Sequence, residues 1–498
     1  MLLLALLACK PDPAADPTGD WADVAAIFAQ ELEDRQVPAA AVVVRRHGEV
    51  LWSQGFGTLS PDHATPVGPD SLFRIGSVTK SLTAVALLQQ VDDGLISLDD
   101  HLVDQVPDLH FAQDPEWGDA ITLRHLLSHQ SGLLDYAVFD HGDDALLSSW
   151  LTGDYAAHAY LMAPPGAFWN YANPNFSFAG LVAETVDGAP YTDVMGSRVL
   201  QPLGLLRTTF DGEQVLSDGD WASGRTVDWN TGEGEVWVTP TAYDSASMRP
   251  AGFAWSSAAE LSLFTSFLLN GEPAVLSDSA RAEMQGPVIS TEMMGDTSFY
   301  GYGLMFNEGF FLGSRWIDAP LVSHQGAIPG YSADLYLLPE QGASVVVLAA
   351  ADGAYLSAVA DALYALELPE GSAPDLSYDT DFTPFEGTWY DPNNVGTLEV
   401  AGEGDTLTVQ APLLDAHHIP YGETLVPITP GNFLWEVQGI QTVVSFILDR
   451  DGVDYLRTRY FVATREPAPA PPETALRAWL RGLRAEPRGP VYTSRPPR

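Results

Sequence analysis

Residues 73–82 read Phe-Arg-Ile-Gly-Ser-Val-Thr-Lys-Ser-Leu and lead directly into the stretch Leu82–Val91. That stretch is apolar on nearly every side and Gly94 follows it, which predicts a buried central helix ending there. Three residues apart on this helix, Ser77 and Lys80 share one face. The 498 residues contain only two lysines, so a general need for positive charge does not account for Lys80. A buried lysine can lose its proton and act as a base, whereas arginine stays protonated.

The Ser77–Lys80 spacing suits nucleophilic catalysis. A serine hydroxyl is a poor nucleophile until a base takes its proton. At a helix N-terminus the Ser77 N–H lacks a partner within the helix, so it can point at a developing oxyanion. The S-x-x-K spacing belongs to serine acyl-transfer enzymes only where second and third motifs accompany it. The simpler alternative makes Ser77 a helix N-cap.

Two later segments supply such partners. Tyr171-Ala172-Asn173 follows Pro164-Pro165-Gly166, and His324-Gln325-Gly326 opens a late region of strand character. Each also has a structural alternative. Tyr171 and Asn173 could serve packing and a turn, and His324 could be a structural histidine at a strand end.

Composition and charge limit the classes of function. The chain is 46% hydrophobic and 10% aromatic, which is typical of a globular protein of two to four domains. Its formal charge is -43, so no basic surface is available to neutralise phosphates, and we expect no nucleic-acid partner. Seven arginines lie between Arg465 and Arg498. This basic tail either docks on the acidic body or trails in solvent.

The N-terminus suggests a location. Cys9 is the single cysteine, so no intrachain disulfide can form. Leu6-Leu7-Ala8-Cys9 resembles a bacterial lipobox, in which the cysteine is lipidated, and residues 10–20 would form a flexible tether. We therefore expect a protein of the bacterial cell envelope that meets the membrane only through a lipid at Cys9. The alternative is a plain leader and secretion, because the apolar run is short and no Lys or Arg precedes it.

The order of elements predicts an α+β fold. Residues 21–35 have helical spacing, and residues 39–44 and 49–55 form two strands joined at His47-Gly48. Residues 95–290 are helix-like and rich in loops. Strand character returns at 333–338 and 343–350, and a helix is expected at 355–368. This order indicates an antiparallel sheet flanked by helices, with an inserted helical subdomain.

A second domain should follow a Gly-Ser-Ala-Pro linker at 371–374. Residues 397–400, 406–409, 433–437, 442–448 and 453–462 alternate in polarity, with turns at Gly402-Glu403-Gly404 and Asp451-Gly452. Such short strands predict a small antiparallel β-barrel or sandwich. We expect four units: a leader and tether (1–20), the main domain (21–370), the barrel (375–466) and a Pro/Arg-rich tail (467–498).

Taken together, these segments resemble the serine β-lactamase-related family. That family takes in class C β-lactamases, D-alanyl-D-alanine carboxypeptidases, D-aminopeptidases and β-lactamase-like esterases. The barrel resembles the lipocalin-like domains of some members. The matching segments lie in order between residues 39 and 352: Phe73–Lys80, Gly94–Asp100, Ile121–Leu133, Pro202–Leu205, Ala251–Phe253, Tyr300–Gly303 and Ser323–Tyr331.

The resemblance implies a β-lactamase/transpeptidase-like fold and a role for each site residue. Ser77 would be the acylated nucleophile, Lys80 would help to deprotonate it, and Tyr171 would share the proton transfer. Asn173 would orient Lys80 and the substrate amide. The oxyanion hole would be the backbone N–H groups of Ser77 and Ala327. Gly326 would let the substrate lie close to its strand, and His324 stands where β-lactamases have a substrate-binding lysine.

We therefore expect a serine hydrolase that forms an acyl-enzyme on small esters or D-amino-acid peptides and amides, without cofactor or metal. The alternatives are a β-lactamase, which His324 disfavours because histidine is mostly neutral at pH 7, and a non-catalytic binding or sensor protein. His125 and His129 have a metal-like i, i+4 spacing. The resemblance instead implies a structural role for both. His417-His418 has no evident partner, so we expect solvent exposure there.

Overall fold

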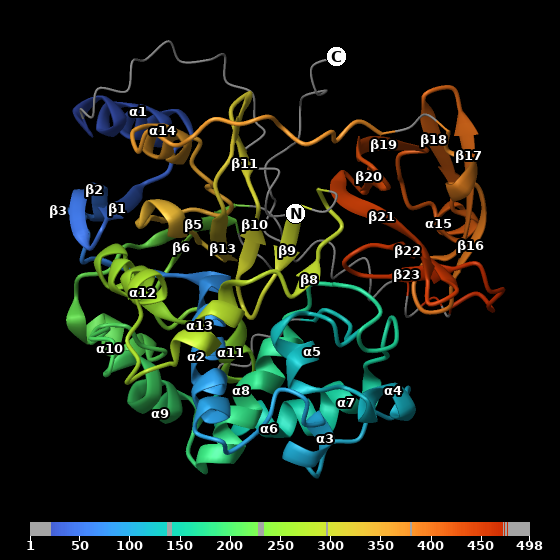
Figure 1. Cartoon of the computed structure of the whole chain (residues 1–498), viewed down its shortest axis with the longest axis horizontal. Coiled ribbons are helices and arrows are strands. Elements are labelled where there is room, and N and C mark those ends of the chain that lie inside the picture. The colour runs from blue at the N-terminus through green and yellow to red at the C-terminus, as the bar shows by residue number, and fades with distance from the viewer. Residues whose placement is uncertain are drawn as a thin grey trace.

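The computed structural model describes residues 21–136, 142–227, 234–294, 297–378 and 381–471, together with Glu473 and Leu476. Cys9 and most of the Pro/Arg-rich tail lie outside these residues. We call residues 21–370 the N-terminal domain and residues 381–466 the barrel. In Figure 1 the barrel lies to the right of the N-terminal domain, whose sheet stands above a group of helices.

An antiparallel sheet of nine strands, counted over the described residues, organises the N-terminal domain. The predicted hairpin at His47-Gly48 and the strand pair around residue 340 lie next to each other at its centre. In spatial order the strands are β3 (His63–Pro66), β2 (Glu49–Ser60), β1 (Ala39–Arg46), β15 (Ala343–Ala349), β14 (Tyr331–Leu338), β13 (Leu321–Ile328), β10 (Met305–Asn307), β9 (Ser298–Tyr300) and β8 (Ile289–Ser290).

Both faces of the sheet are buried. Val42 and Val44 of β1 pack into one hydrophobic cluster with α1 (Trp21–Asp34) and α14 (Ala358–Tyr364). Val43 points to the other face and joins the cluster of the central helices, as expected for side chains that alternate along a strand. The helix predicted at 355–368 is shorter, Ala358–Tyr364, and at its N-terminus the Glu31 carboxylate accepts hydrogen bonds from the N–H groups of Ser357 and Ala358.

The central helix of the domain is α2 (Thr79–Asp92), whose residues Thr79 to Gln90 are all buried. Other helices surround it, and three two-stranded sheets complete the described part of the domain: β4 (Leu72–Arg74) with β7 (Trp255–Ser257), β5 (Gly224–Val227) with β6 (Glu235–Val238), and β11 (Phe310–Leu312) with β12 (Arg315–Ile317). The helices are α3 (Leu102–Gln105), α4 (Pro115–Asp119), α5 (Leu123–Leu127), α6 (Ala145–Ser149), α7 (Ala156–His158), α8 (Pro174–Asp187), α9 (Tyr191–Met195), α10 (Gly212–Asp218), α11 (Arg249–Gly252), α12 (Ala258–Asn270) and α13 (Asp278–Gln285).

The C-terminal domain is a closed antiparallel barrel of eight strands within the described residues. Aromatic side chains, among them Trp389, Phe433, Trp435 and Phe446, fill its interior and form its own core. The strands are β16 (Gly387–Asp391), β17 (Gly396–Glu403), β18 (Thr406–Gln410), β19 (Thr424–Thr429), β20 (Asn432–Val437), β21 (Ile440–Arg450), β22 (Val453–Arg457) and β23 (Val462–Thr464), with the short helix α15 (Pro412–Ala416) between β18 and β19.

The structure corrects one expectation here. The alternating run 453–462 is not one strand but the hairpin β22–β23. Thr458 makes its turn: the Thr458 Oγ1 accepts hydrogen bonds from the N–H groups of Tyr460 and Phe461 at 3.2 and 3.0 Å. A hydroxyl that binds local backbone N–H groups favours a turn over a continuing strand.

The barrel packs directly against the N-terminal domain. Phe168 and Tyr455 meet with ring centroids 5.0 Å apart, inside a small apolar cluster shared by both domains. Arg450 forms an ion pair with Glu292 and donates to the Ala167 carbonyl. Arg457 is buried and donates to the carbonyls of Trp169 and Thr291. Three of the four arginines between residues 381 and 466 (450, 457 and 459) thus contact the other domain.

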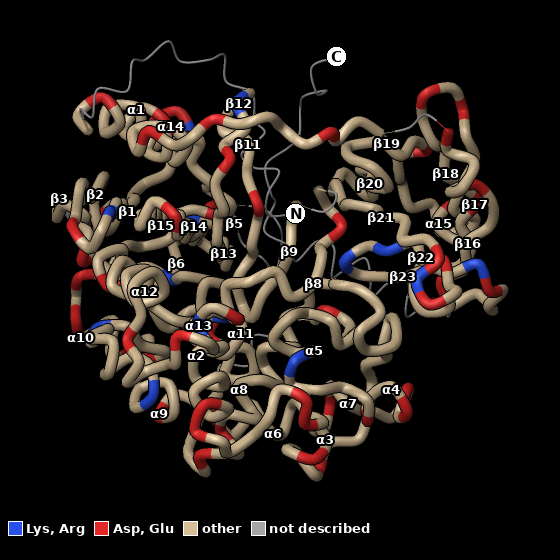
Figure 2. Tube along the Cα trace, in the orientation of Figure 1, with Lys and Arg blue, Asp and Glu red and all other residues tan. Residues whose placement is uncertain are grey.

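Acidic side chains are spread over both domains, with few cations between them (Figure 2). Among the described residues, no helix is both long and apolar enough to span a bilayer.

Candidate active site

Ser77 lies at a transition between two kinds of helix. The 3-10 turn η2 (Gly76–Val78) contains Ser77, and α2 begins at Thr79. The Thr79 hydroxyl donates to the Gly76 carbonyl at 2.7 Å, which fixes the turn. Ser77 is half-buried, whereas its neighbours Gly76 and Val78 are buried. The serine is therefore partly exposed beside the N-terminus of the central helix.

Lys80 lies beneath Ser77 with no exposed surface. Its Nζ is 3.0 Å from the Ser77 Oγ, 2.7 Å from the Asn173 Oδ1 and 2.6 Å from the Ala251 carbonyl oxygen. Burial lowers the pKa of Lys80 well below its ordinary value; the Asp135 carboxylate raises it and the Arg459 guanidinium lowers it again. Desolvation disfavours the charged ammonium, so a neutral amine becomes accessible beside the serine.

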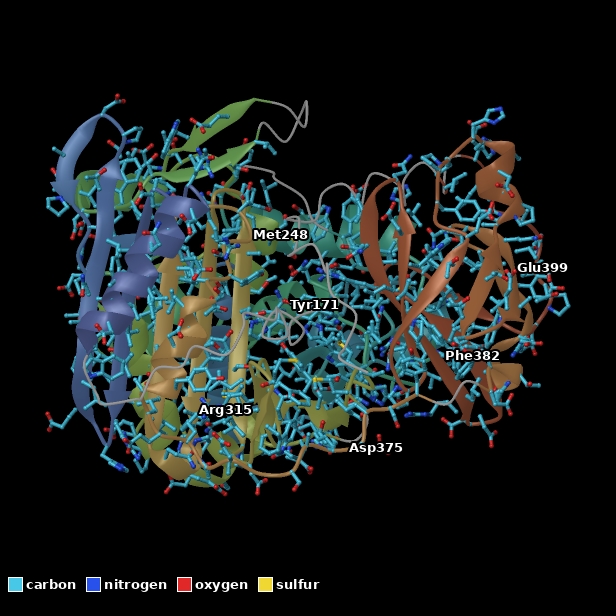
Figure 3. All side chains as sticks on the ribbon, turned by 90° about the horizontal axis from the view of Figure 1, so that it is seen from above. Tyr171, Met248, Arg315, Asp375, Phe382 and Glu399 are labelled. Carbon is cyan, nitrogen blue, oxygen red and sulfur yellow. The ribbon has the colours of Figure 1, made fainter. Side chains whose placement is uncertain are left out.

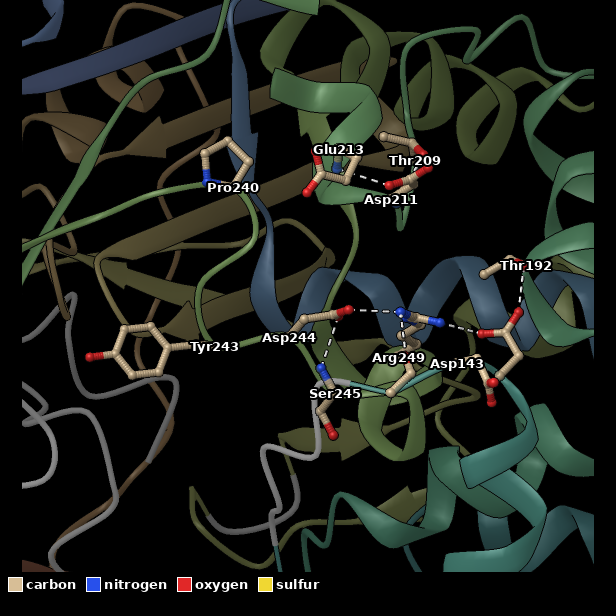
Figure 4. A network of polar contacts seen from close by, with 12 residues as sticks. Asp143, Thr192, Thr209, Asp211, Glu213, Pro240, Tyr243, Asp244, Ser245 and Arg249 are labelled. Carbon is tan, nitrogen blue, oxygen red and sulfur yellow. Dashed lines mark hydrogen bonds and ion pairs between the residues drawn. The ribbon is translucent and has the colours of Figure 1, made fainter. Parts of the chain in front are cut away.

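The Ala251 carbonyl is held by a network at the start of α11, drawn in Figure 4. Arg249, the first residue of that helix, forms ion pairs with Asp144 and Asp244. Asp144 also accepts a hydrogen bond of 2.6 Å from the Thr192 hydroxyl. Arg249 and Asp144 together thus link α11 to the segments around residues 144 and 192. These contacts stabilise the helical turn whose Ala251 carbonyl accepts a hydrogen bond from Lys80.

The strand β13 passes very close to Ser77. A Cβ added to Gly326 would lie 2.0 Å from the Ile75 carbonyl oxygen and 3.2 Å from the Ser77 nitrogen. A Cβ added to Gly76, whose φ is +49°, would lie 2.6 Å from the Ala327 nitrogen. Two glycines therefore permit the approach that brings the backbone amides of Ser77 and Ala327 together. Ala327, like Ser77, is half-buried among buried neighbours.

Tyr171 and Asn173 come from the segment that leads into α8. Asn173 is the N-cap residue of that helix, and its side-chain oxygen accepts the bond from Lys80. The Lys80 Nζ lies 4.9 Å from the centre of the Tyr171 ring, and the His129 ring packs on the tyrosine at 4.3 Å. In Figure 3 Tyr171 lies between the sheet and the barrel. The structure thus brings Ser77, Lys80, Tyr171 and Asn173 together.

The His324 side chain is an uncharged imidazole in this structure. It is fully buried, and burial lowers its pKa to about 3. Its Nδ1 donates to the Gln325 carbonyl at 2.7 Å, so its Nε2 accepts from the Tyr300 hydroxyl at 3.1 Å. Both ring nitrogens are therefore engaged within the protein. A substrate contact at His324 would require the bond to Tyr300 to be given up, and no cation stands at this position.

The two histidines of metal-like spacing serve local structure. The His125 side chain accepts from the Thr122 N–H and completes a capping box of α5. The His129 Nδ1 accepts from the Ala172 N–H at 3.2 Å and from the Asn175 side chain at 3.1 Å. His129 thereby supports the backbone between Tyr171 and Asn173. His417 and His418 belong to the barrel. His418 is exposed as expected, whereas His417 is only partly exposed and its Nδ1 lies 3.9 Å from the Glu473 carboxylate. Cys9 is outside the described residues.

Sequence reasoning missed two charged residues at the site. The Asp135 carboxylate accepts a 2.7 Å hydrogen bond from the Asn173 backbone N–H. The Arg459 guanidinium binds the same carboxylate at 2.8 and 2.7 Å and lies 4.8 Å from the centre of the Tyr171 ring. Asp135 lies two residues after the quoted stretch Ile121–Leu133, which was a usable signal. Nothing near Arg459 in the sequence indicates a site residue.

Comparison with known proteins gives one family. A family model described as Beta-lactamase matches residues 24–369. Protein flp of Staphylococcus aureus (strain NCTC 8325 / PS 47) is 25% identical over 339 residues, which cover 66% of this chain and 63% of that protein. The match therefore spans less than two thirds of that relative.

Solved structures agree on the fold. The octameric penicillin-binding protein homologue from Pyrococcus abyssi has a TM-score of 0.60 at 23% identity and covers 90% of this chain and 100% of its own. A D-stereospecific amidohydrolase from Streptomyces sp. has a TM-score of 0.51 at 27% identity and covers 67% of this chain and 94% of its own.

Proposed function

This chain belongs to the beta-lactamase family, and from that premise we propose that it is a serine hydrolase that works through an acyl-enzyme. Ser77 is the nucleophile in this proposal, Lys80 is its base and no cofactor takes part. The observation that carries the proposal is the bond of 3.0 Å between the Lys80 Nζ and the Ser77 Oγ, made by a lysine whose pKa burial lowers.

The proposed reaction begins with proton transfer. Neutral Lys80 accepts the Ser77 hydroxyl proton as the Ser77 oxygen attacks the substrate carbonyl carbon. The carbonyl oxygen becomes an oxyanion, which the N–H groups of Ser77 and Ala327 stabilise. The tetrahedral intermediate collapses when the carbon–heteroatom bond breaks, and the leaving group takes a proton from Lys80 or Tyr171. Water then attacks the acyl carbon while neutral Lys80 takes its proton. The bond between that carbon and the Ser77 oxygen breaks, the Ser77 oxygen takes the proton from Lys80, and the acid is released.

We propose small esters and D-amino-acid amides or peptides as substrates. The similarity to the Streptomyces D-stereospecific amidohydrolase supports the second class. The buried, neutral His324 argues against tight binding of a β-lactam carboxylate, since it offers no charge there. β-Lactam hydrolysis remains the alternative activity, and a non-catalytic binding protein the alternative of another class.

We further propose that the protein works at the bacterial cell envelope, anchored through a lipid on Cys9 and otherwise free of the membrane. The support is the lipobox-like sequence Leu6-Leu7-Ala8-Cys9 followed by a polar tether. Metabolic labelling with a clickable fatty acid, compared between the wild type and Cys9→Ser, tests it. Equal labelling of the two proteins would refute it.

Intact-protein mass spectrometry after exposure to a fluorophosphonate tests the catalytic proposal, with Ser77→Ala beside the wild type. We expect a single adduct that the variant lacks. A panel of paired D- and L-aminoacyl amides, small esters and a penicillin then assigns the substrate class. The absence of an adduct with the fluorophosphonate and with a fluorescent penicillin would favour the binding-protein alternative.

A further inference from the structure

The barrel reaches the proposed catalytic residues through the tip of one hairpin. Arg457, the last residue of β22, is buried and tied to the Trp169 and Thr291 carbonyls of the N-terminal domain. Thr458 then turns the chain, and Arg459 stands at the tip. The Asn170 side chain donates to the Arg459 carbonyl at 3.3 Å. Hydrogen bonds from Arg457 and to the Arg459 carbonyl therefore fix the backbone at this tip against the N-terminal domain. They fix the position from which the Arg459 side chain extends.

From this tip a continuous series of polar contacts leads to the nucleophile. The Arg459 guanidinium binds the Asp135 carboxylate at 2.7 and 2.8 Å, and this carboxylate accepts from the Asn173 N–H at 2.7 Å. The Asn173 Oδ1 lies 2.7 Å from the Lys80 Nζ, which lies 3.0 Å from the Ser77 Oγ. The Asp135 side chain is only 5% exposed, so its charge needs a buried or local partner.

We propose that Arg459 is a positioning residue of the active site: it holds Asp135 against the Asn173 amide, which keeps the Asn173 side chain on Lys80, and the barrel thereby forms part of the site. The inference rests on the proposed serine-hydrolase function. The Arg459 guanidinium also lies 4.8 Å from the centre of the Tyr171 ring, and the Lys80 Nζ lies 4.9 Å from the same centre. One cation of the barrel thus contacts two groups that surround the base.

The charges of Asp135 and Arg459 affect the protonation of Lys80, which an uncharged packing contact would not do. The groups around Lys80 are the Asp135 carboxylate, the Arg459 guanidinium, the Tyr171 phenol and the neutral imidazoles of His129 and His324. Without Arg459 the nearly buried carboxylate stands unopposed and favours the protonated amine. Lys80 must be neutral to accept the serine proton. Loss of Arg459 should therefore move the acid limb, the rise of kcat/KM on the low-pH side of its pH profile, to higher pH.

The test measures kcat/KM, or the rate of fluorophosphonate labelling, against pH for Arg459→Gln, Asp135→Asn and the double variant. We expect Arg459→Gln to move the acid limb up by about one pH unit, which is about a tenfold loss at pH values below the limb. Asp135→Asn should move the limb to lower pH. The double variant, in which both charges are gone, should return the limb to near its wild-type position.

Arg450→Gln is the matched control, because Arg450 also links the barrel to a carboxylate of the N-terminal domain but takes no part in the contacts of Lys80. We expect its pH profile to coincide with that of the wild type. A limb that does not move in Arg459→Gln, or that moves equally in Arg450→Gln, would overturn the inference. Should Arg459→Gln not fold, an unmoved limb in Asp135→Asn would overturn it alone.

These outcomes separate the two proposals. If the wild type takes no fluorophosphonate adduct, the proposed function fails before any limb is measured. If the wild type is labelled and its profile is shared by Arg459→Gln, the hydrolase proposal stands and the positioning role of Arg459 fails.

Discussion

Replacing Gly326 by alanine should separate the two halves of the proposed oxyanion hole. The added Cβ would lie 2.0 Å from the Ile75 carbonyl oxygen and 2.9 Å from its carbonyl carbon. Carbon and oxygen approach to about 3.3 Å at closest, so β13 and η2 must move apart by about 1 Å. That shift acts on the Ala327 N–H, because Ala327 directly follows Gly326 in the strand.

The size of the effect follows from the geometry. A misplacement of about 1 Å costs about a hundredfold in rate, and the loss of one oxyanion donor costs about 10²–10³-fold, equivalent to about 2.7–4 kcal/mol. We therefore expect kcat/KM of Gly326→Ala to fall by about 100- to 1000-fold. The protein should remain folded, because the clash is confined to the contact between one strand and one turn.

The assay combines the second-order rate of fluorophosphonate labelling with hydrolysis of a small ester, and thermal unfolding confirms that each variant is folded. Gly153→Ala is the control, because a Cβ there meets nothing within 4 Å. A folded Gly326→Ala protein that reacts as fast as Gly153→Ala would refute the role that we give to the approach of β13 to Ser77.

Three further predictions concern the base, the domain interface and a buried carboxyl. Lys80→Arg keeps the charge but removes the base, so fluorophosphonate labelling should slow by several orders of magnitude; a near-normal rate would contradict the assignment. Arg457→Met should lower the free energy of unfolding in urea by roughly 2–6 kcal/mol, because each of two carbonyls left without this donor costs about 1–3 kcal/mol. Burial raises the pKa of Asp334 to about 6. The folded state therefore holds a proton that the unfolded state releases above about pH 4, so the free energy of unfolding falls as pH rises from 4 to 6. Asp334→Asn should reduce this loss of unfolding free energy by about 3 kcal/mol, as measured by urea unfolding at pH 4 and pH 6. The same loss in the variant as in the wild type would exclude Asp334 as its source.

The sequence was sufficient for features set by local spacing. Ser77 and Lys80 are three residues apart, in the 3-10 turn η2 and the helix α2 that continues it, so their contact follows from the spacing of two consecutive helical turns. Strands β1, β2, β14 and β15 were predicted from their strand character and the turn residues between them, whereas β3, β8, β9 and β10 were not predicted. The family assignment is confirmed by the match to residues 24–369, and the predicted barrel is present.

What escaped prediction depends on contacts between distant segments. Asp135 and Arg459 are 324 residues apart, and no local pattern links them. Polarity alternates through 453–462, so Arg459 was placed inside a strand, whereas the Thr458 hydroxyl makes the turn that exposes it to the other domain. The Ala251 carbonyl that binds Lys80 was equally hidden, because a backbone oxygen carries no sequence signal.

The strongly acidic composition explains why a cation beside Asp135 matters. A formal charge of -43 favours protonated amines throughout the molecule, although salt screens the distant part of that field. Burial must therefore overcome the field to give Lys80 a lowered pKa, and an unopposed carboxylate near the ammonium would work against it. Arg459 neutralises that carboxylate at close range, where salt screens least. The chain can thus combine an acidic surface with a neutral lysine at its centre, provided that the barrel stays docked.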